Sequence, residues 1–195
     1  MTAGNQRRQR GFTLIELLVT LMIASIIAIM AVPAFAGFLA RQQLASDVNE
    51  LISVLSFARS EAIKQRSDTT VVFSPPNAAT SNRRPKSCRN NEVAEELSDS
   101  NGVSTIYRYS DWCYWVVKSD AVDEILRLGQ SANITTPDQA FSLTFQSLGD
   151  ADIGDCRAAS SAPCQITLTP QRDDIAPVTL AVNITGSIRR QETAQ

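Results

Sequence analysis

The chemistry that this sequence can support rests on one isolated glutamate, four cysteines, two groups of arginines and one group of aspartates. Glu16 is the only charged residue between Gly11 and Ala40, so its carboxylate stands in an otherwise apolar run. At membrane depth an isolated charge costs about 2.5–3.5 kcal/mol on insertion scales. Glu16 is therefore expected to have a partner of opposite charge.

The four cysteines lack the Cys-x-x-Cys spacing that is typical of zinc and redox sites. An even number of cysteines after a membrane segment favours disulfides in an oxidising compartment. Three pairings are possible, and we favour Cys156 with Cys164, across the short segment CRAASSAPC, and Cys88 with Cys113. Four reduced, buried thiols are the alternative.

An enzyme is disfavoured by what the sequence lacks. Histidine, the usual general base and a common metal ligand, does not occur in the chain. No glycine-rich loop to bind phosphate and no recognisable pair of nucleophile and base is present in the sequence. Trp112, Tyr114 and Trp115 are expected to divide between the core and the surface of a strand. We therefore expect no catalytic residues and no cofactor.

A short acidic segment, GDADIGDC, raises the question of a metal site. It places Asp150, Asp152 and Asp155 close together, and their carboxylates are oxygen ligands of the kind that calcium prefers. The glutamate that completes an EF-hand loop is missing, and acidic turns are common. Calcium is therefore kept as an alternative to an ordinary turn.

The apolar run is long enough to cross a membrane. Phe12 to Val32 is 21 residues, or about 31 Å as a helix. The arginines before it predict a cytoplasmic N-terminus, with the rest of the chain outside the inner membrane. A cleaved signal peptide has a shorter apolar core, and a plain anchor explains neither Glu16 nor the sharp boundary at RGF.

The remaining length and charge fit one globular domain behind this anchor. The chain has 195 residues, which suits a single domain plus a membrane segment, or two very small domains. From Arg41 onward, 15 basic and 19 acidic residues give a net charge of −4. A net-acidic domain has no general attraction to nucleic acid.

A second helical pattern follows the apolar run without a break. Apolar residues recur at helical spacing on one face, at Leu44, Val48, Leu51, Leu55, Ala58 and Ala62. Charged residues such as Asp47 are expected to lie away from it. The sequence predicts one helix over roughly residues 12–66, loosened at Pro33, whose second half packs on a domain. A two-stranded coiled coil is the alternative, but the repeat is short for one.

After Arg66 the pattern changes to that of short strands. The predicted strands are residues 69–73, 103–109, 112–118, 124–128, 141–145, 165–169 and 178–184. A helix followed only by strands predicts an α+β fold, with the helix packed on an antiparallel sheet. The interval from Ser74 to Gly102 is long and polar, so we expect an exposed excursion that Cys88 ties to the strand at 112–118.

The segment GFTLIELLVTL resembles the leader junction of type IV pilins and pseudopilins. In that family a prepilin peptidase cuts after the glycine and methylates the new N-terminal phenylalanine. The resemblance implies a leader at 1–11 that is removed between Gly11 and Phe12, a transmembrane helix half at 12–40, and a pilin-like globular domain at 41–195. The domain would lie in the periplasm until the chain enters a pilus or pseudopilus.

The resemblance also implies a role for Glu16, which matches the acidic residue of the family's motif. In a filament the free amine of a neighbouring subunit's Phe12 supplies the opposite charge, so the carboxylate favours axial stacking of subunits. Before assembly Glu16 lies near the helix start, where the helix dipole and snorkelling reduce the penalty for its charge. Glu16 is thus expected to act in subunit assembly.

A second resemblance covers most of the chain. The segments FARSEAI (57–63), DWCYWVVKSD (111–120), LTFQSLG (143–149) and VNITGSIRR (182–190) are similar to motifs of the GspH/FimT-like group. Tyr114 departs from that pattern, because it stands where glycine is usual.

The GspH/FimT-like group contains minor pilins of type IV pili and the H-type pseudopilin of type II secretion. The resemblance places both in a small complex at the filament tip that primes assembly. The paired cysteines and the long loop favour a minor pilin, and the H-type pseudopilin is the alternative. The implied partners are other minor and major pilin subunits, the prepilin peptidase and, before assembly, the inner membrane.

DNA binding, known from one branch of the group, is a third alternative. That branch carries a C-terminal GRxR motif, and Gly186 and Arg189 fit its spacing, although Ser187 replaces the first arginine and Arg190 adds a charge. A second basic cluster in the long loop comprises Arg83, Arg84, Lys86 and Arg89. Such clusters bind phosphate without sequence specificity, but nearby acidic residues offset the charge of the loop.

Overall fold

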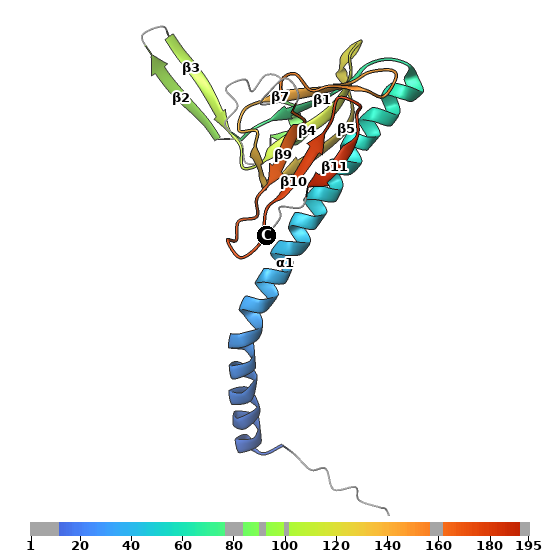
Figure 1. Cartoon of the computed structure of the whole chain (residues 1–195). Helices are drawn as coiled ribbons and strands as arrows, with labels where there is room; N and C mark the ends of the chain where they lie inside the picture. The colour runs from blue at the N-terminus through green and yellow to red at the C-terminus, as the bar shows by residue number, and fades with distance from the viewer. Residues whose placement is uncertain (1–11, 77–83, 90–92, 100–101, 157–161, 192–195) are drawn as a thin grey trace, which may run out of the picture. The chain divides into compact units, whose positions relative to one another are not determined.

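A computed structural model describes residues 12–76, 84–89, 93–99, 102–156 and 162–191 (Figure 1). The chain divides into two compact units, Met1–Leu39 and Ala40–Gln195. The elements are α1 (Leu14–Gln65), β1 (Thr69–Ser74), the 3-10 helix η2 (Lys86–Cys88), β2 (Val93–Asp99), β3 (Gly102–Arg108), β4 (Trp112–Lys118), β5 (Ala121–Ser131), β6 (Ile134–Thr136), β7 (Phe141–Phe145), β8 (Ala151–Asp152), β9 (Cys164–Leu168), β10 (Val178–Val182) and β11 (Ile188–Gln191).

The long helix begins and ends within two residues of the predicted bounds. Its C-terminus is closed by Arg66, whose φ of 51° lies in the left-handed region. The N–H of Ser67 donates to the carbonyl of Ala62 at 3.3 Å, and the N–H of Arg66 donates to that of Ile63 at 3.4 Å. This is a Schellman motif, which satisfies the last carbonyls and turns the chain into β1.

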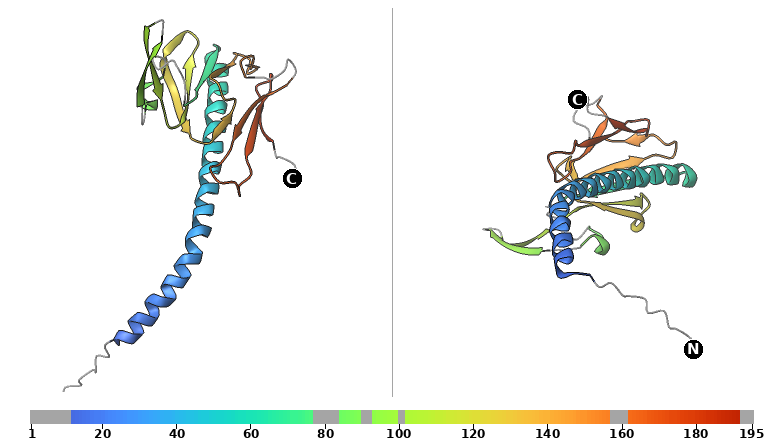
Figure 2. Two further views of the ribbon diagram at one scale, coloured as in Figure 1. Left: turned by 90° about the vertical axis from the view of Figure 1, so that its left-hand side faces the viewer. Right: turned by 90° about the horizontal axis from the view of Figure 1, so that it is seen from below.

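The strands of the second unit form three antiparallel sheets. The five-stranded sheet has the order β5-β4-β1-β7-β8, the four-stranded sheet has the order β11-β10-β9-β6, and within the described residues β2 and β3 form a two-stranded sheet. Figure 2 shows the second half of α1 between the two larger sheets. The α+β fold with a helix packed on antiparallel sheet is therefore confirmed.

The core lies along this part of α1 and is built from the inner faces of both sheets. The predicted apolar face is buried, and Leu51, Leu55 and Ala58 have no exposed surface. The placement predicted for Asp47 is wrong, because the end of β5 and the loop after it bind this side chain. Asp47 is 8% exposed and accepts hydrogen bonds from Ser131 Oγ at 2.6 Å and Asn133 Nδ2 at 2.8 Å.

Several segments differ from the predicted strands: β6 and β8 were not predicted, and β5 extends beyond residues 124–128 at both ends. The interval 74–102 is not only a loop, because it contains η2 and β2, and β2 pairs with β3 from Val93↔Arg108 to Asp99↔Gly102. The sequence of β2, VAEELSD, is polar and lacks the apolar alternation of a strand. Its strand conformation is therefore supported by pairing with β3. The strand predicted at 178–184 ends at Val182, where a turn leads into β11.

Both disulfides have the pairing that we favoured. Cys88 is joined to Cys113, which ties η2 to β4, and Cys156 is joined to Cys164. The first of these covers the outer face of β4, where Cys88, Cys113, Trp115 and Val117 form a small second core. The expectation that the aromatic residues of β4 divide between core and surface is therefore wrong, since Trp112, Tyr114 and Trp115 are all at most 6% exposed.

Tyr114 is accommodated by a glycine on the neighbouring strand. It pairs directly with Gly129 of β5, and a Cβ built on Gly129 would lie 2.6 Å from Tyr114 Cζ. The ring fills the space that a side chain on β5 would occupy, so the glycine on β5 makes room for the tyrosine on β4. Burial raises the pKa of the Tyr114 hydroxyl far above its usual range, so this group stays neutral.

Arg59 links α1 to two turns that are distant in sequence. Its Nε donates to the carbonyl of Gly149 at 2.9 Å, and its Nη2 donates to that of Thr185 at 3.1 Å. Gly149 and Gly186 have φ of 89° and 71°, and a Cβ on Gly186 would collide with the Gly149 carbonyl oxygen. We call Arg59, Gly149, Thr185 and Gly186 the Arg59 clamp, which joins the edge of one sheet to the edge of the other.

The close approach at Gly186 can be tested by substitution. Gly186→Ala is expected to lower the free energy of unfolding by at least about 2 kcal/mol, because the new Cβ meets a backbone atom in a left-handed conformation. Gly154→Ala is the control, since its Cβ would lie 3.3 Å from a side-chain oxygen, Asp152 Oδ1. Urea unfolding of the full chain in detergent, followed by tryptophan fluorescence, measures both. Equal midpoints would contradict the clamp.

Candidate assembly site

The first half of α1 presents apolar side chains on all sides. In the unit Met1–Leu39, Phe12 is 83% exposed, and the exposed large residues include Leu14, Ile15, Leu17, Leu18, Leu21, Met22, Ile23 and Ile26. An apolar surface of this extent marks a segment that is buried by a partner or by lipid. The polar hydroxyls of Thr20 and Ser25 do not interrupt it, because each donates to a carbonyl one turn earlier.

Glu16 lies in the first turn of this helix. Thr13 precedes the first helical residue, and its Oγ1 accepts a hydrogen bond from the Glu16 N–H at 3.3 Å. Thr13 is therefore the N-cap of α1, and Glu16 is the third helical residue, as in the Thr-x-x-Glu form of a capping box. A carboxylate at this position also interacts favourably with the helix dipole. The Glu16 side chain is exposed and available to a partner.

The predicted cleavage junction and transmembrane segment lie at the start of the chain. Phe12 is the first described residue, and Gly11 lies outside the described residues. No helix in the described part of the chain is both long and apolar enough to cross a membrane, so the predicted transmembrane segment is not confirmed.

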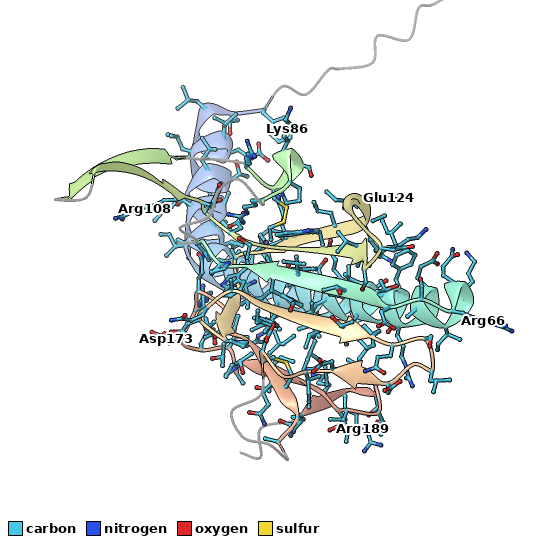
Figure 3. All side chains as sticks on the ribbon, turned by 90° about the horizontal axis from the view of Figure 1, so that it is seen from above. Arg66, Lys86, Arg108, Glu124, Asp173 and Arg189 are labelled. Atoms are coloured by element: carbon cyan, nitrogen blue, oxygen red, sulfur yellow. A yellow bond between two sulfur atoms is a disulfide. The ribbon has the colours of Figure 1, made fainter. Side chains whose placement is uncertain are left out.

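The two basic clusters are not brought together. Lys86 of η2 and Arg189 of β11 project from opposite sides of the globular unit in Figure 3. Arg189 and Arg190 are exposed, as predicted, whereas Arg83 lies outside the described residues and Arg89 is half-buried.

Arg84 is wrongly predicted as a surface contact to phosphate. It is 3% exposed, with its guanidinium 3.8 Å from the centre of the Tyr109 ring and its Nη2 donating to the Asp111 carbonyl at 2.6 Å. Packing on Tyr109 and the loop backbone has drawn this cation inward, where it holds the segment around η2 in place. The loop therefore presents fewer positive charges to solvent than its sequence predicts.

The aspartates of the acidic segment also have local roles. Asp152 Oδ1 accepts the N–H of Gly154 at 3.0 Å, and Asp155 Oδ2 accepts the hydroxyl of Ser142 at 2.7 Å. Asp150 is half-buried beside them in sequence. Within the described residues, no three acidic or other metal-binding side chains gather into a group that could hold a metal ion.

Comparisons with known protein families match two parts of the sequence. The prokaryotic N-terminal methylation motif matches residues 6–32, and the model of the type II transport protein GspH matches residues 47–186. The chain belongs to the GspH family. This protein is accordingly a type IV pilin-like subunit, of the class that contains minor pilins and pseudopilins.

No curated protein matches this GspH-family chain. Among solved structures, it is similar to the crystal structure of the type IV minor pilin FimU of Pseudomonas aeruginosa strain PAO1. The TM-score is 0.45 and the sequence identity is 17%, over 80% of this chain and 92% of that chain.

The Arg59 clamp lies within the part that matches the GspH family. Arg59, Gly149 and Gly186 come from three of the segments that carry the sequence resemblance, and the structure joins them at one point. Sequence reasoning missed this contact because nothing in the spacing of three separate motifs indicates that they meet. The positive φ of the two glycines is the feature that a search for turns could have found.

The N-cap of this GspH-family protein can be tested at Thr13. Thr13→Ala is expected to weaken the helix start by about 1 kcal/mol, because the Glu16 N–H loses its acceptor. Hydrogen exchange at the Glu16 amide of the full chain in micelles should then accelerate about fivefold. Thr13→Ser keeps the hydroxyl and should exchange like the native chain. Equal exchange in Thr13→Ala and Thr13→Ser would show that the cap contributes nothing.

Proposed function

We propose that this chain is a minor pilin of a type IV pilus, a structural subunit without enzymatic activity that helps prime filament assembly in a tip complex. The observation that carries the proposal is the pairing of a methylation motif with an apolar helix that bears one carboxylate near its start. Such a helix favours packing against the helices of other subunits, with the globular unit left to contact neighbouring minor and major pilins.

In this proposal the newly made precursor is first inserted into the inner membrane. The prepilin peptidase removes residues 1–11 and methylates Phe12, the helix half at 12–40 holds the precursor in the membrane, and the unit at 41–195 folds in the periplasm. The two disulfides support an oxidising compartment for this unit. Assembly then transfers the helix from lipid to the filament core, where the apolar helices of other subunits replace the lipid chains around it.

Glu16 is proposed to set the axial register of this assembly. Its carboxylate is exposed on an apolar helix, and the amine of a neighbouring subunit's Phe12 would neutralise it at membrane depth. The capping role found for Thr13 and Glu16 does not use the carboxylate in any described hydrogen bond to the main chain. The charge is therefore left for an intermolecular pair.

The pairing is tested by Glu16→Ala. This variant should insert and be cleaved normally, yet its amount in sheared filaments should fall at least about tenfold, as expected if an ion pair of about 1.4 kcal/mol or more is lost. Ser25→Ala is the control on the same helix, because the Ser25 hydroxyl bonds only the Met22 carbonyl of its own helix in the structure. Immunoblots of cell and filament fractions give the measurement. Normal incorporation of Glu16→Ala would refute the pairing.

The cleavage site is tested separately by Gly11→Val. A β-branched side chain before the scissile bond should block the prepilin peptidase, so the precursor should accumulate with its leader attached. Mass spectrometry of the purified chain distinguishes the precursor from a mature chain that begins with methylated Phe12. Efficient processing of Gly11→Val would show that the junction is misassigned.

The H-type pseudopilin of a type II secretion system is the second candidate, because the matching family is described as a type II transport protein. Deleting the gene separates the two. A minor pilin should be needed for surface pili and be recovered in them, whereas a pseudopilin should be needed for export of secreted enzymes. Loss of export with normal piliation would overturn the first candidate. DNA uptake remains a third proposal that would depend on Arg189 and Arg190, since Arg84 is buried.

A further inference from the structure

A groove with a volume of about 310 Å³ runs between α1 and the edge of the four-stranded sheet. Leu44 and Val48 of α1 and Val178 of β10 form its floor, and they are at most 7% exposed. Ile175 extends this apolar floor. All of these residues belong to the unit Ala40–Gln195. The groove is within the size range of sites that bind small ligands.

Two exposed arginines line the same groove. Arg41 comes from α1 and Arg190 from β11, and neither forms a salt bridge with another described residue. Asp174 is an acid near Arg41, but its pKa is lowered mainly by a hydrogen bond from Arg172, whose Nε lies 2.8 Å from Asp174 Oδ1, and Arg41 contributes least. Two cations beside an apolar floor are complementary to a ligand that joins an anionic group to a hydrocarbon chain.

Arg190 reaches this groove because of its place on β11. It pairs with Leu180, which is fully buried against the core, so the two residues share the inner face of the sheet. Arg189 pairs with Ala181 and lies on the other face of the same strand. Two adjacent arginines with similar exposure therefore face different surroundings, and only Arg190 lines the groove.

The position of the groove in the sequence favours lipid over a peptide as the ligand. Arg41 is the first charged residue after Glu16, so the groove begins where the apolar part of the chain ends. If residues 12–40 are in the membrane, as proposed above, Arg41 lies at the level of the lipid headgroups. An arginine at this level is attracted to anionic lipid headgroups. The acyl chain of the same lipid can pack on the apolar floor of the groove.

We propose that the groove between Arg41 and Arg190 binds one anionic phospholipid, with the phosphate at the two guanidinium groups and part of an acyl chain along Leu44, Val48 and Val178. The inference rests on the proposed membrane precursor. Such a lipid would hold the globular unit at the membrane surface before assembly, and it would be released when the subunit leaves the bilayer.

Native mass spectrometry of the full chain in non-ionic detergent tests this site. With added palmitoyl-oleoyl phosphatidylglycerol, the native chain should retain one lipid more than with the matching phosphatidylcholine. Arg190→Gln and Arg41→Gln should each lower this selective retention about fivefold, as expected for one cation near an anionic headgroup. Arg189→Gln is the matched control and should retain lipid like the native chain. Equal retention of the two lipids, or equal loss in Arg189→Gln, would overturn the proposal.

Two further measurements separate the lipid from other ligands. Ala176→Trp fills the apolar part of the groove and keeps both arginines, so it should also reduce retention; no change would contradict the acyl-chain contact. Displacement of the phosphatidylglycerol by excess inorganic phosphate would show a simple anion site and overturn the lipid assignment.

The filament assay shows whether a failure belongs to this inference or to the proposed function. If Arg190→Gln keeps its lipid but no longer enters filaments, the groove binds a carboxylate of a neighbouring subunit and the lipid proposal fails. If the native chain itself is absent from filaments yet retains the lipid selectively, the proposed function fails and the lipid site stands.

Discussion

Burial of α1 on two sides is the constraint on which the globular unit depends. Most helices of small domains cover one face of one sheet, but here Leu51, Leu55 and Ala58 lie in a core that receives side chains from both larger sheets. The two sheets share no strand, so the helix is their common support. A change that shifts α1 would therefore alter both sheets at once, including the groove at the edge of the four-stranded sheet.

The contacts that fix the sheets around the helix are polar and local. Arg59 binds the carbonyls of two turns, Asp47 binds the loop after β5, and the disulfide between Cys88 and Cys113 holds η2 on the outer face of β4. Each contact lies at the margin of the apolar core. Burial of apolar surface is not directional, so the core alone does not fix the orientation of the sheets. Hydrogen bonds and a disulfide are directional, so these contacts fix how the sheets are oriented around the helix.

The two units of the chain follow different physical rules. In Ala40–Gln195 the large apolar side chains are mostly buried within the chain, whereas those of the described part of Met1–Leu39 are exposed. The unit Ala40–Gln195 has a core of its own, whereas the helix half in Met1–Leu39 needs an apolar environment from outside the chain. A subunit with this division would suit the proposed transfer from a bilayer to a filament, because its globular core need not change.

The sequence by itself determined the elements whose signals are local. The apolar run, the helical spacing from Leu44 to Ala62 and the short strand-like runs after Arg66 predicted the helix, most strands and the α+β fold, because these patterns follow from helix and strand geometry. The leader junction and Glu16 could be recognised because a short contiguous motif carries them. Cysteine count and spacing were enough to favour the disulfide pairing that the structure contains.

Only the tertiary structure decided which polar residues are buried and what they contact. Asp47 and Arg84 were expected at the surface, but Asp47 is bound by Ser131 and Asn133, and the Arg84 guanidinium packs on the Tyr109 ring. Strand β2 forms although its own sequence is polar, because pairing with β3 supplies its hydrogen bonds. Arg189 and Arg190 are equivalent in the sequence, yet the register of β11 places one of them at the groove. These outcomes depend on contacts between segments, which the residue pattern within one segment does not show.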